Sequence, residues 1–128
     1  MDQLALGVAA LVAAGIIGIG ANYLLRPRAA TASPSFGLPL PEEGPNIEWW
    51  LRLKGVRDIV SGLVLLTMMV WGGPHLAGIL LLVLAIIPIG DMGVILAAKG
   101  SARSAFGMHG LTALIMILAA VPLTMGAA

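Results

Sequence analysis

Long apolar runs dominate the pattern of hydrophobic and polar positions. Four of them follow one another along the chain: about 4–25, 49–71, 75–98 and 104–125. Each is close to the roughly 20 residues that an α-helix needs to cross the hydrocarbon core of a bilayer. Turn-forming residues separate the runs, such as Gly72-Gly73-Pro74 and Lys99-Gly100-Ser101. The pattern predicts an all-α fold, an integral membrane four-helix bundle that forms a single transmembrane domain over 1–128.

The connection between the first two runs, about 29–46, has a different character. It contains Pro34, Pro39, Pro41 and Pro45. Because a proline ring interrupts helical hydrogen bonding, we predict a Pro-rich loop without regular helix. Its apolar part, 36–41, is either a plain linker or a lid over the mouth of the bundle.

Composition agrees with a membrane protein and excludes several function classes. The chain is 59% hydrophobic and 10% charged, with a mean hydropathy of +1.03. A net charge of +1 gives no basis for nucleic acid as a partner, since duplex binding needs clustered basic residues. The absence of cysteine excludes thiol redox chemistry and thiolate metal sites. The predicted partner is therefore the lipid bilayer.

Basic residues predict the orientation in the membrane. All seven lie in or near the first and third connections: Arg26, Arg28, Arg52, Lys54, Arg57, Lys99 and Arg103. By the positive-inside rule, these connections are cytoplasmic and both termini are extracytoplasmic, in a multi-pass protein of the cell membrane.

Small residues indicate where helices approach closely, since lipid offers no hydrophobic drive for helix association. One predicted stripe in the first run recurs every four residues: Ala10, Ala14, Gly18 and Asn22. In the other three runs the small residues predicted to lie at contacts form pairs: Gly55 and Gly62, Gly93 and Ala97, and Gly107 and Gly110.

Ionisable residues inside the runs are candidates for function, because each costs at least a few kcal/mol in a bilayer unless it is paired or wetted. At a rise of about 1.5 Å per residue, Arg57 lies roughly 12 Å beyond Trp49, Asp91 roughly 12 Å before Lys99, and His109 roughly 9 Å past Arg103. Three helices therefore bring the candidate catalytic residues to one layer: Asp58, Asp91, Arg57 and His109.

Three further residues are candidates for substrate binding: Lys54, Ser61 and Asn22. Lys54, Arg57, Asp58 and Ser61 fall within an arc of about 100° on one helix, which predicts a polar face toward the bundle interior. Asn22 lies at a shallower depth. Pro88, one turn before Asp91, frees the Leu84 carbonyl from its helical hydrogen bond and favours a polar cavity there.

Two interpretations of this layer stay open. Buried ion pairs either staple the helices together or line a polar pocket. No metal or cofactor is predicted, because the carboxylates and His109 lack a recognised ligand spacing. His75, next to Pro74, is interpreted as an exposed loop histidine. Ser61 and His109 alone do not make a nucleophilic triad.

The string Lys54-Gly55-Val56-Arg57-Asp58-Ile59, with Gly62, resembles an uncharacterised family of small four-span membrane proteins, a domain of unknown function near the DoxX-like group. The resemblance extends to 36–39, to Pro88-Ile89-Gly90-Asp91 and to His109-Gly110, and so covers nearly the whole chain. It implies a four-helix membrane fold and draws attention to the same ionisable residues, without an activity.

Three functions are consistent with the sequence. One is an accessory or assembly protein whose polar layer grips a membrane protein partner or a second copy of the chain. Another is a membrane enzyme for acid–base chemistry, of isomerase or epoxide-opening type, on a lipophilic small molecule, with Asp58 or Asp91 as base and Arg57 stabilising an oxyanion. The third is a proton-coupled small transporter. A cavity above about 300 Å³ that reaches Arg57 and Asp91 would favour the second and third functions.

Overall fold

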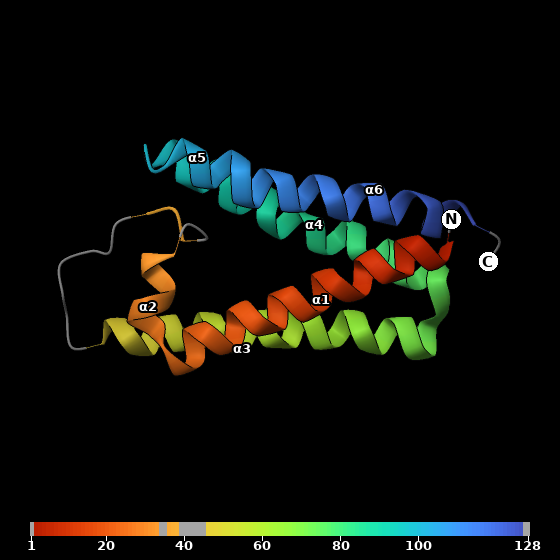
Figure 1. Ribbon diagram of the computed structural model, residues 1–128, viewed down its shortest axis with the longest axis horizontal. Helices are drawn as coiled ribbons and strands as arrows, with labels where there is room; N and C mark the ends of the chain where they lie inside the picture. Colours follow the sequence, from red (N-terminus) through yellow and green to blue (C-terminus); the bar gives the residue numbers. More distant parts are fainter. Residues whose placement is uncertain (1, 34–35, 39–45, 127–128) are drawn as a thin grey trace.

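The computed structural model describes residues 2–33, 36–38 and 46–126, which are mostly helical, with no strand within these ranges (Figure 1). The elements in chain order are α1 (Asp2–Leu25), α2 (Pro27–Ala32), α3 (Ile47–Thr67), η1 (Met68–Gly72), α4 (Gly73–Ala97), α5 (Ala102–Ser104), η2 (Ala105–Gly110) and α6 (Leu111–Met125). The two η segments are π-helical, and η2 joins α5 and α6 into one continuous rod. The predicted all-α bundle is confirmed.

Three segments are long and apolar enough to span a membrane: Asp2–Leu25, Ile47–Ala97 and Ala102–Met125. The middle segment has 51 residues and folds back on itself, so that α3 and α4 run in opposite directions (Figure 1). Gly73 makes this reversal, because its φ of 78° is in the left-handed region that glycine adopts readily. The fold is that of an all-α helical membrane bundle.

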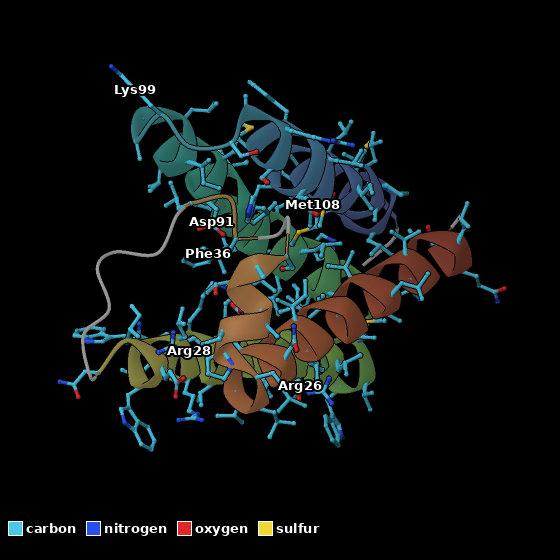
Figure 2. All side chains as sticks on the ribbon, turned by 60° about the vertical axis from the view of Figure 1, so that its left-hand side comes forward. Arg26, Arg28, Phe36, Asp91, Lys99 and Met108 are labelled. Carbon is cyan, nitrogen blue, oxygen red and sulfur yellow. The ribbon has the colours of Figure 1, made fainter. Side chains whose placement is uncertain are left out.

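The bundle consists of two helix pairs, α1 with α3 and α4 with α6. Contacts between α1 and α6 join the pairs, whereas α3 and α4 barely touch. Figure 1 shows the two pairs close together at the end that carries the chain termini and further apart at the opposite end. We call that opposite end the basic end, because Arg26, Arg28 and Lys99 lie there (Figure 2).

Glycines allow α1 and α3 to approach closely. A Cβ on Gly55 would lie 2.5 Å from the Gly20 carbonyl oxygen, and one on Gly62 would lie 2.7 Å from the Ala13 carbonyl oxygen. The predicted contacts at Gly55 and Gly62 are therefore confirmed. The predicted stripe on α1 is wrong, because Ala14, Gly18 and Asn22 are exposed.

The buried face of α1 is formed instead by Ala5, Ala9, Ala13 and Gly20. These residues face the glycines of α3 and the apolar core, which contains Leu65, Leu81 and Met116. In the other helices, Gly93, Ala97 and Gly107 are exposed rather than packed, and Gly110 lies against Met92.

The connection after α1 departs from the prediction. Residues 29–32 belong to helix α2, because Pro27 occupies its first turn, where a missing N–H costs nothing, and no proline follows until residue 34. Residues 34–35 and 39–45 of the predicted loop lie outside the described residues.

Residues Phe36–Leu38, which we call the strap, connect the two helix pairs at the basic end (Figure 2). On one side the Phe36 ring packs against Tyr23 of α1, with ring centroids 6.2 Å apart. On the other side the Ser101 amide donates a 3.0 Å hydrogen bond to the Gly37 carbonyl. Gly37 has a φ of 76°, and a Cβ there would lie 2.8 Å from Ile95 of α4. The strap therefore ties the α1–α3 pair to the turn between α4 and α5.

Candidate functional site

A cavity of about 110 Å³ lies between the helix pairs. Its lining comes from α1, α3, α4, η2 and α6: Ile16, Ile19, Tyr23, Lys54, Asp58, Ser61, Leu84, Ile87, Pro88, Asp91, Met108, His109, Thr112 and Met116. It lies between the apolar core at Leu81 and Met116 and a smaller buried cluster of Tyr23, Ala30 and Leu51. The cavity is thus a feature of how the two pairs pack together.

Asp91 and His109 form one polar pair in the cavity. The His109 Nδ1 atom lies 3.5 Å from the Asp91 carboxylate, and the His109 side chain is only 17% exposed. His109 is presented by the π-helical segment η2, a form of helix that often occurs at functional sites. On the facing helix, Pro88 has no N–H to offer the Leu84 carbonyl, and both residues line the cavity. Two local departures from regular α-helix therefore accompany this pair.

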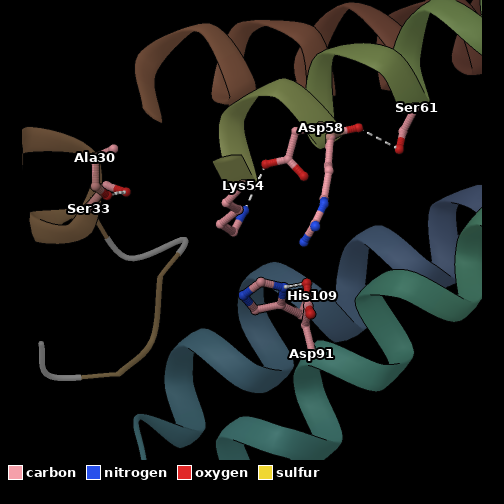
Figure 3. A network of polar contacts seen from close by, with 8 residues as sticks. Ala30, Ser33, Lys54, Asp58, Ser61, Asp91 and His109 are labelled. Atoms are coloured by element: carbon pink, nitrogen blue, oxygen red, sulfur yellow. Dashed lines mark hydrogen bonds and ion pairs between the residues drawn. The ribbon is translucent and has the colours of Figure 1, made fainter. Parts of the chain in front are cut away.

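Lys54 and Asp58 form the second pair, one turn apart on α3. The Lys54 Nζ atom donates a 2.7 Å hydrogen bond to the Asp58 carboxylate. The same ammonium lies 4.2 Å from the centroid of the Tyr23 ring, which is buried. Figure 3 shows this pair facing Asp91 and His109 across the space between the helix pairs. Two acid–base pairs from separate halves of the bundle therefore share one cavity.

The ionisable lining residues lie toward the basic end, and the residues deeper in the bundle are apolar or, as at Ser61, carry a hydroxyl. Leu84 precedes Asp91 by seven residues on α4, and Met116 follows His109 by seven residues. Both steps lead away from the basic end. At the rise of an α-helix, each of these steps is about 10 Å. The cavity therefore has an ionisable end near the strap and an apolar end deeper in the bundle.

Hydroxyl groups complete the polar lining. Ser61 Oγ donates to the Arg57 carbonyl at 2.9 Å, and Thr112 Oγ1 donates to the Met108 carbonyl at 2.6 Å. Each hydroxyl uses its proton within its own helix, so the oxygen lone pairs are what it presents to the cavity.

The predicted site residues separate into two groups. Asp58, Asp91 and His109, predicted as catalytic, line the cavity together with Lys54 and Ser61, predicted as substrate-binding residues. Two predicted residues, Arg57 and Asn22, are exposed and are not among the lining residues. Arg57 is next to the lining residue Asp58 in the sequence, and Asn22 is next to the lining residue Tyr23. Because adjacent residues on a helix point about 100° apart, the neighbour of a lining residue need not face the cavity.

The sequence analysis missed Tyr23, Met108 and Thr112 of the lining. Thr112 follows His109 by three residues and so shares its helix face, a spacing that was available in the sequence. Tyr23 had no such signal, because only the crossing of α1 with α3 brings it beneath Lys54.

Metal ligands do not cluster in the part of the chain that the structure describes. No three His, Cys, Asp or Glu side chains converge there. The available set at the cavity is one imidazole and two carboxylates on different helices, and Asp58 is bonded to Lys54. The arrangement suits proton transfer better than metal binding.

His75 is not the exposed loop histidine that was predicted. It lies in the first turn of α4, is half-buried, and its Nδ1 atom is 3.0 Å from the Thr124 carbonyl of α6. Pro74 is compatible with a helical position for His75, because proline fits the first turn of a helix and so does not end α4. His75 therefore joins α4 to α6 at the end remote from the cavity.

Comparisons with curated proteins and with solved structures found no match. One family model matches residues 13–123, a range that includes the cavity lining from Ile16 to Met116 and the strap. The chain therefore belongs to the family described as Domain of unknown function (DUF4267).

Proposed function

We propose that the protein crosses the membrane four times and binds a small amphiphilic molecule from the bilayer in the cavity between its helix pairs. The observation that carries this proposal is the cavity lining, which is ionisable near the strap and apolar about two turns deeper. A ligand with a hydroxyl or carbonyl group at one end and a hydrocarbon body matches this order. The basic end of the bundle faces the cytoplasm in this arrangement.

The cavity volume limits the ligand. About 110 Å³ is well below the 300 Å³ or more that is typical of sites for drug-sized molecules. The volume fits the polar end of a ligand, such as one hydroxyl-bearing aromatic ring, and the rest of a larger ligand extends out of the cavity toward the bilayer.

An accessory role predicts polar groups that pair with each other. Lys54 pairs with Asp58 and His109 with Asp91, and all four side chains also line the cavity. The cavity is smaller than about 300 Å³ and Arg57 is not among its lining residues, so its size does not favour an enzyme or a transporter over the accessory role. The binding proposal is supported instead by the order of ionisable and apolar residues in the lining.

Acid–base catalysis is a second candidate function, and the Asp91–His109 pair favours it. A carboxylate beside an imidazole is a common proton-accepting arrangement, and both side chains line the cavity, where a ligand hydroxyl can approach either group. The Lys54 ammonium across the cavity would stabilise negative charge on the ligand oxygen once its proton has moved. The relationship to the DoxX-like group stays a prediction and contributes nothing to this mechanism.

2-Naphthol is a suitable probe, because it has an apolar body, one hydroxyl, and different emission spectra for its neutral and anionic forms. We expect saturable binding to the protein in nanodiscs, with part of the emission from the naphtholate anion. Leu84→Trp should abolish binding, because the larger side chain fills the apolar end of the cavity. The probe is excited at a wavelength that tryptophan does not absorb, so that the new indole does not contribute to the emission. Leu118→Trp is the matched control, since Leu118 is 64% exposed on the outer face. Equal binding by the two variants would refute the cavity as the binding site.

The catalytic proposal has a separate readout. Asp91→Asn should retain 2-naphthol binding but lose the naphtholate emission, whereas Thr112→Val, another change in the lining, should retain both. Naphtholate emission that survives in Asp91→Asn and in His109→Gln would exclude this pair as the proton acceptor and would leave the binding proposal intact.

A further inference from the structure

A second concave surface lies at the basic end, on the outside of the bundle. We call it the Trp–Arg groove; it has a volume of about 440 Å³ and is lined by Leu24, Asn46, Trp49, Trp50, Arg52, Leu53 and Val56. The residues come from the end of α1, from Asn46 just before α3, and from the first three turns of α3. The groove shares no residue with the cavity between the helix pairs.

Two contacts hold the Arg52 side chain in place. Its Nε atom donates a 3.1 Å hydrogen bond to the Leu24 carbonyl, and its guanidinium carbon lies 4.7 Å from the centroid of the Trp49 ring. The carbonyl belongs to the last turn of α1, where backbone oxygens have no helical partner. One nitrogen is thus occupied, and the two terminal nitrogens make no hydrogen bond within 2–33, 36–38 and 46–126, which leaves their N–H groups available.

The charge of Arg52 has no carboxylate partner among the described residues. Arg28 pairs with Glu48 and Lys54 with Asp58, but no ion pair within 2–33, 36–38 and 46–126 includes Arg52. An oriented guanidinium with an unmatched charge is a typical binding group for a phosphate oxygen.

We propose that the Trp–Arg groove binds the headgroup of an anionic phospholipid, with the phosphate on Arg52 and the start of an acyl chain along Leu53 and Val56. The neighbouring side chains favour a lipid over a soluble anion. Trp49 and Trp50 are 63% and 69% exposed, and indole rings in that position belong at the headgroup level of a bilayer. Leu53 is 51% exposed and Val56 46% exposed, and both lie further along α3 toward the hydrocarbon.

Native mass spectrometry of the detergent-solubilised protein tests this inference. With equal amounts of phosphatidylglycerol and phosphatidylcholine, we expect phosphatidylglycerol adducts to predominate. Arg52→Gln should lower that preference by about fivefold, the factor for one basic side chain near an anionic membrane surface. Arg103→Gln is the matched control, since Arg103 is an exposed basic residue of α5 outside the groove. It should leave the preference unchanged.

Two additional measurements separate the alternatives. Trp49→Leu keeps the charge and removes the ring under Arg52, so it should weaken phosphatidylglycerol binding less than Arg52→Gln does. Excess inorganic phosphate should not displace the lipid. The proposal is overturned if both lipids bind equally, if Arg103→Gln has the same effect as Arg52→Gln, or if inorganic phosphate competes fully, which would indicate a site for free anions.

Discussion

Gly55→Ala tests the close packing of α1 against α3, the helix pair that forms one side of the cavity. A Cβ at residue 55 would lie 2.5 Å from the Gly20 carbonyl oxygen and 2.8 Å from the Leu24 amide nitrogen. Both are backbone atoms, so no side-chain rotation relieves the clash. Ordinary contact begins at 3.4 Å, and α1 and α3 must therefore separate locally by about 0.9 Å, the difference between 3.4 and 2.5 Å.

The expected loss of stability follows from two opposing contributions. Overpacking of a close contact costs about 1–3 kcal/mol, and replacing a helical glycine by alanine returns up to ~1 kcal/mol. A net cost of about 1–2 kcal/mol corresponds to a fall in Tm of roughly 5–10 °C for a chain of this size. Thermal unfolding in detergent, followed by far-UV circular dichroism, measures this change.

Gly18→Ala is the matched control, because a Cβ on Gly18 of α1 meets nothing within 4 Å. This variant gains helix propensity without a clash, so its Tm should stay the same or rise slightly. The two substitutions are chemically identical and differ only in what the new methyl group meets. If Gly55→Ala and Gly18→Ala unfold at the same temperature, close approach of α1 and α3 is not what stabilises this pair.

Three further predictions concern topology, charge pairing and the strap. The sequence has no cysteine, so a single introduced cysteine, as in Arg28→Cys or Trp71→Cys, reports on which side of the membrane its residue lies. An impermeant maleimide should label the two variants from opposite sides of sealed vesicles. Labelling of both from the same side would contradict the proposed four crossings. Asp58→Leu should lower the Tm more than the double variant Lys54→Met with Asp58→Leu, because the single change leaves an ammonium without its partner; equal Tm values would show that the pair is solvated. Gly37→Ala should speed hydrogen exchange at the amide bonded to its carbonyl, because alanine is strained by about 1–2 kcal/mol at a φ of 76°; an unchanged rate would mean that the strap is held by other contacts.

The helices were predictable because apolar runs of membrane length have few alternatives. Their boundaries agree with the structure to within a few residues, and Gly73 reverses the chain where Gly-Gly-Pro was expected to do so. Which face of α1 is buried was not predictable. Small residues recur every four positions on two faces of this helix, one through Ala9 and Ala13 and the other through Ala14 and Gly18. Only the position of Gly55 on the partner helix distinguishes them.

The same limit applies to the candidate site. Counting residues from the ends of the runs placed Asp58, Asp91 and His109 at similar depths, because the rise of a helix is nearly constant. The 100° arc predicted on α3 was right for Lys54, Asp58 and Ser61, which line the cavity, and wrong for Arg57, which is exposed at one edge of the arc of about 100°. Helix periodicity gives the relative rotation of these residues but not how far the polar face turns toward the cavity. The π-helical segment η2, which changes rotation around His109, has no distinctive sequence pattern beyond its glycines.

The division into two helix pairs has a mechanical consequence. Each pair is closely packed within itself, and the pairs are joined at one end by the turn at Gly73 and at the other by the strap. A change in the tilt of one helix pair against the other therefore changes the distance between the Lys54–Asp58 ion pair and the Asp91–His109 pair, before it changes the distances within either residue pair. Helix tilt responds to the hydrophobic thickness of the surrounding bilayer. We therefore expect the width of this cavity to change with the thickness of the membrane.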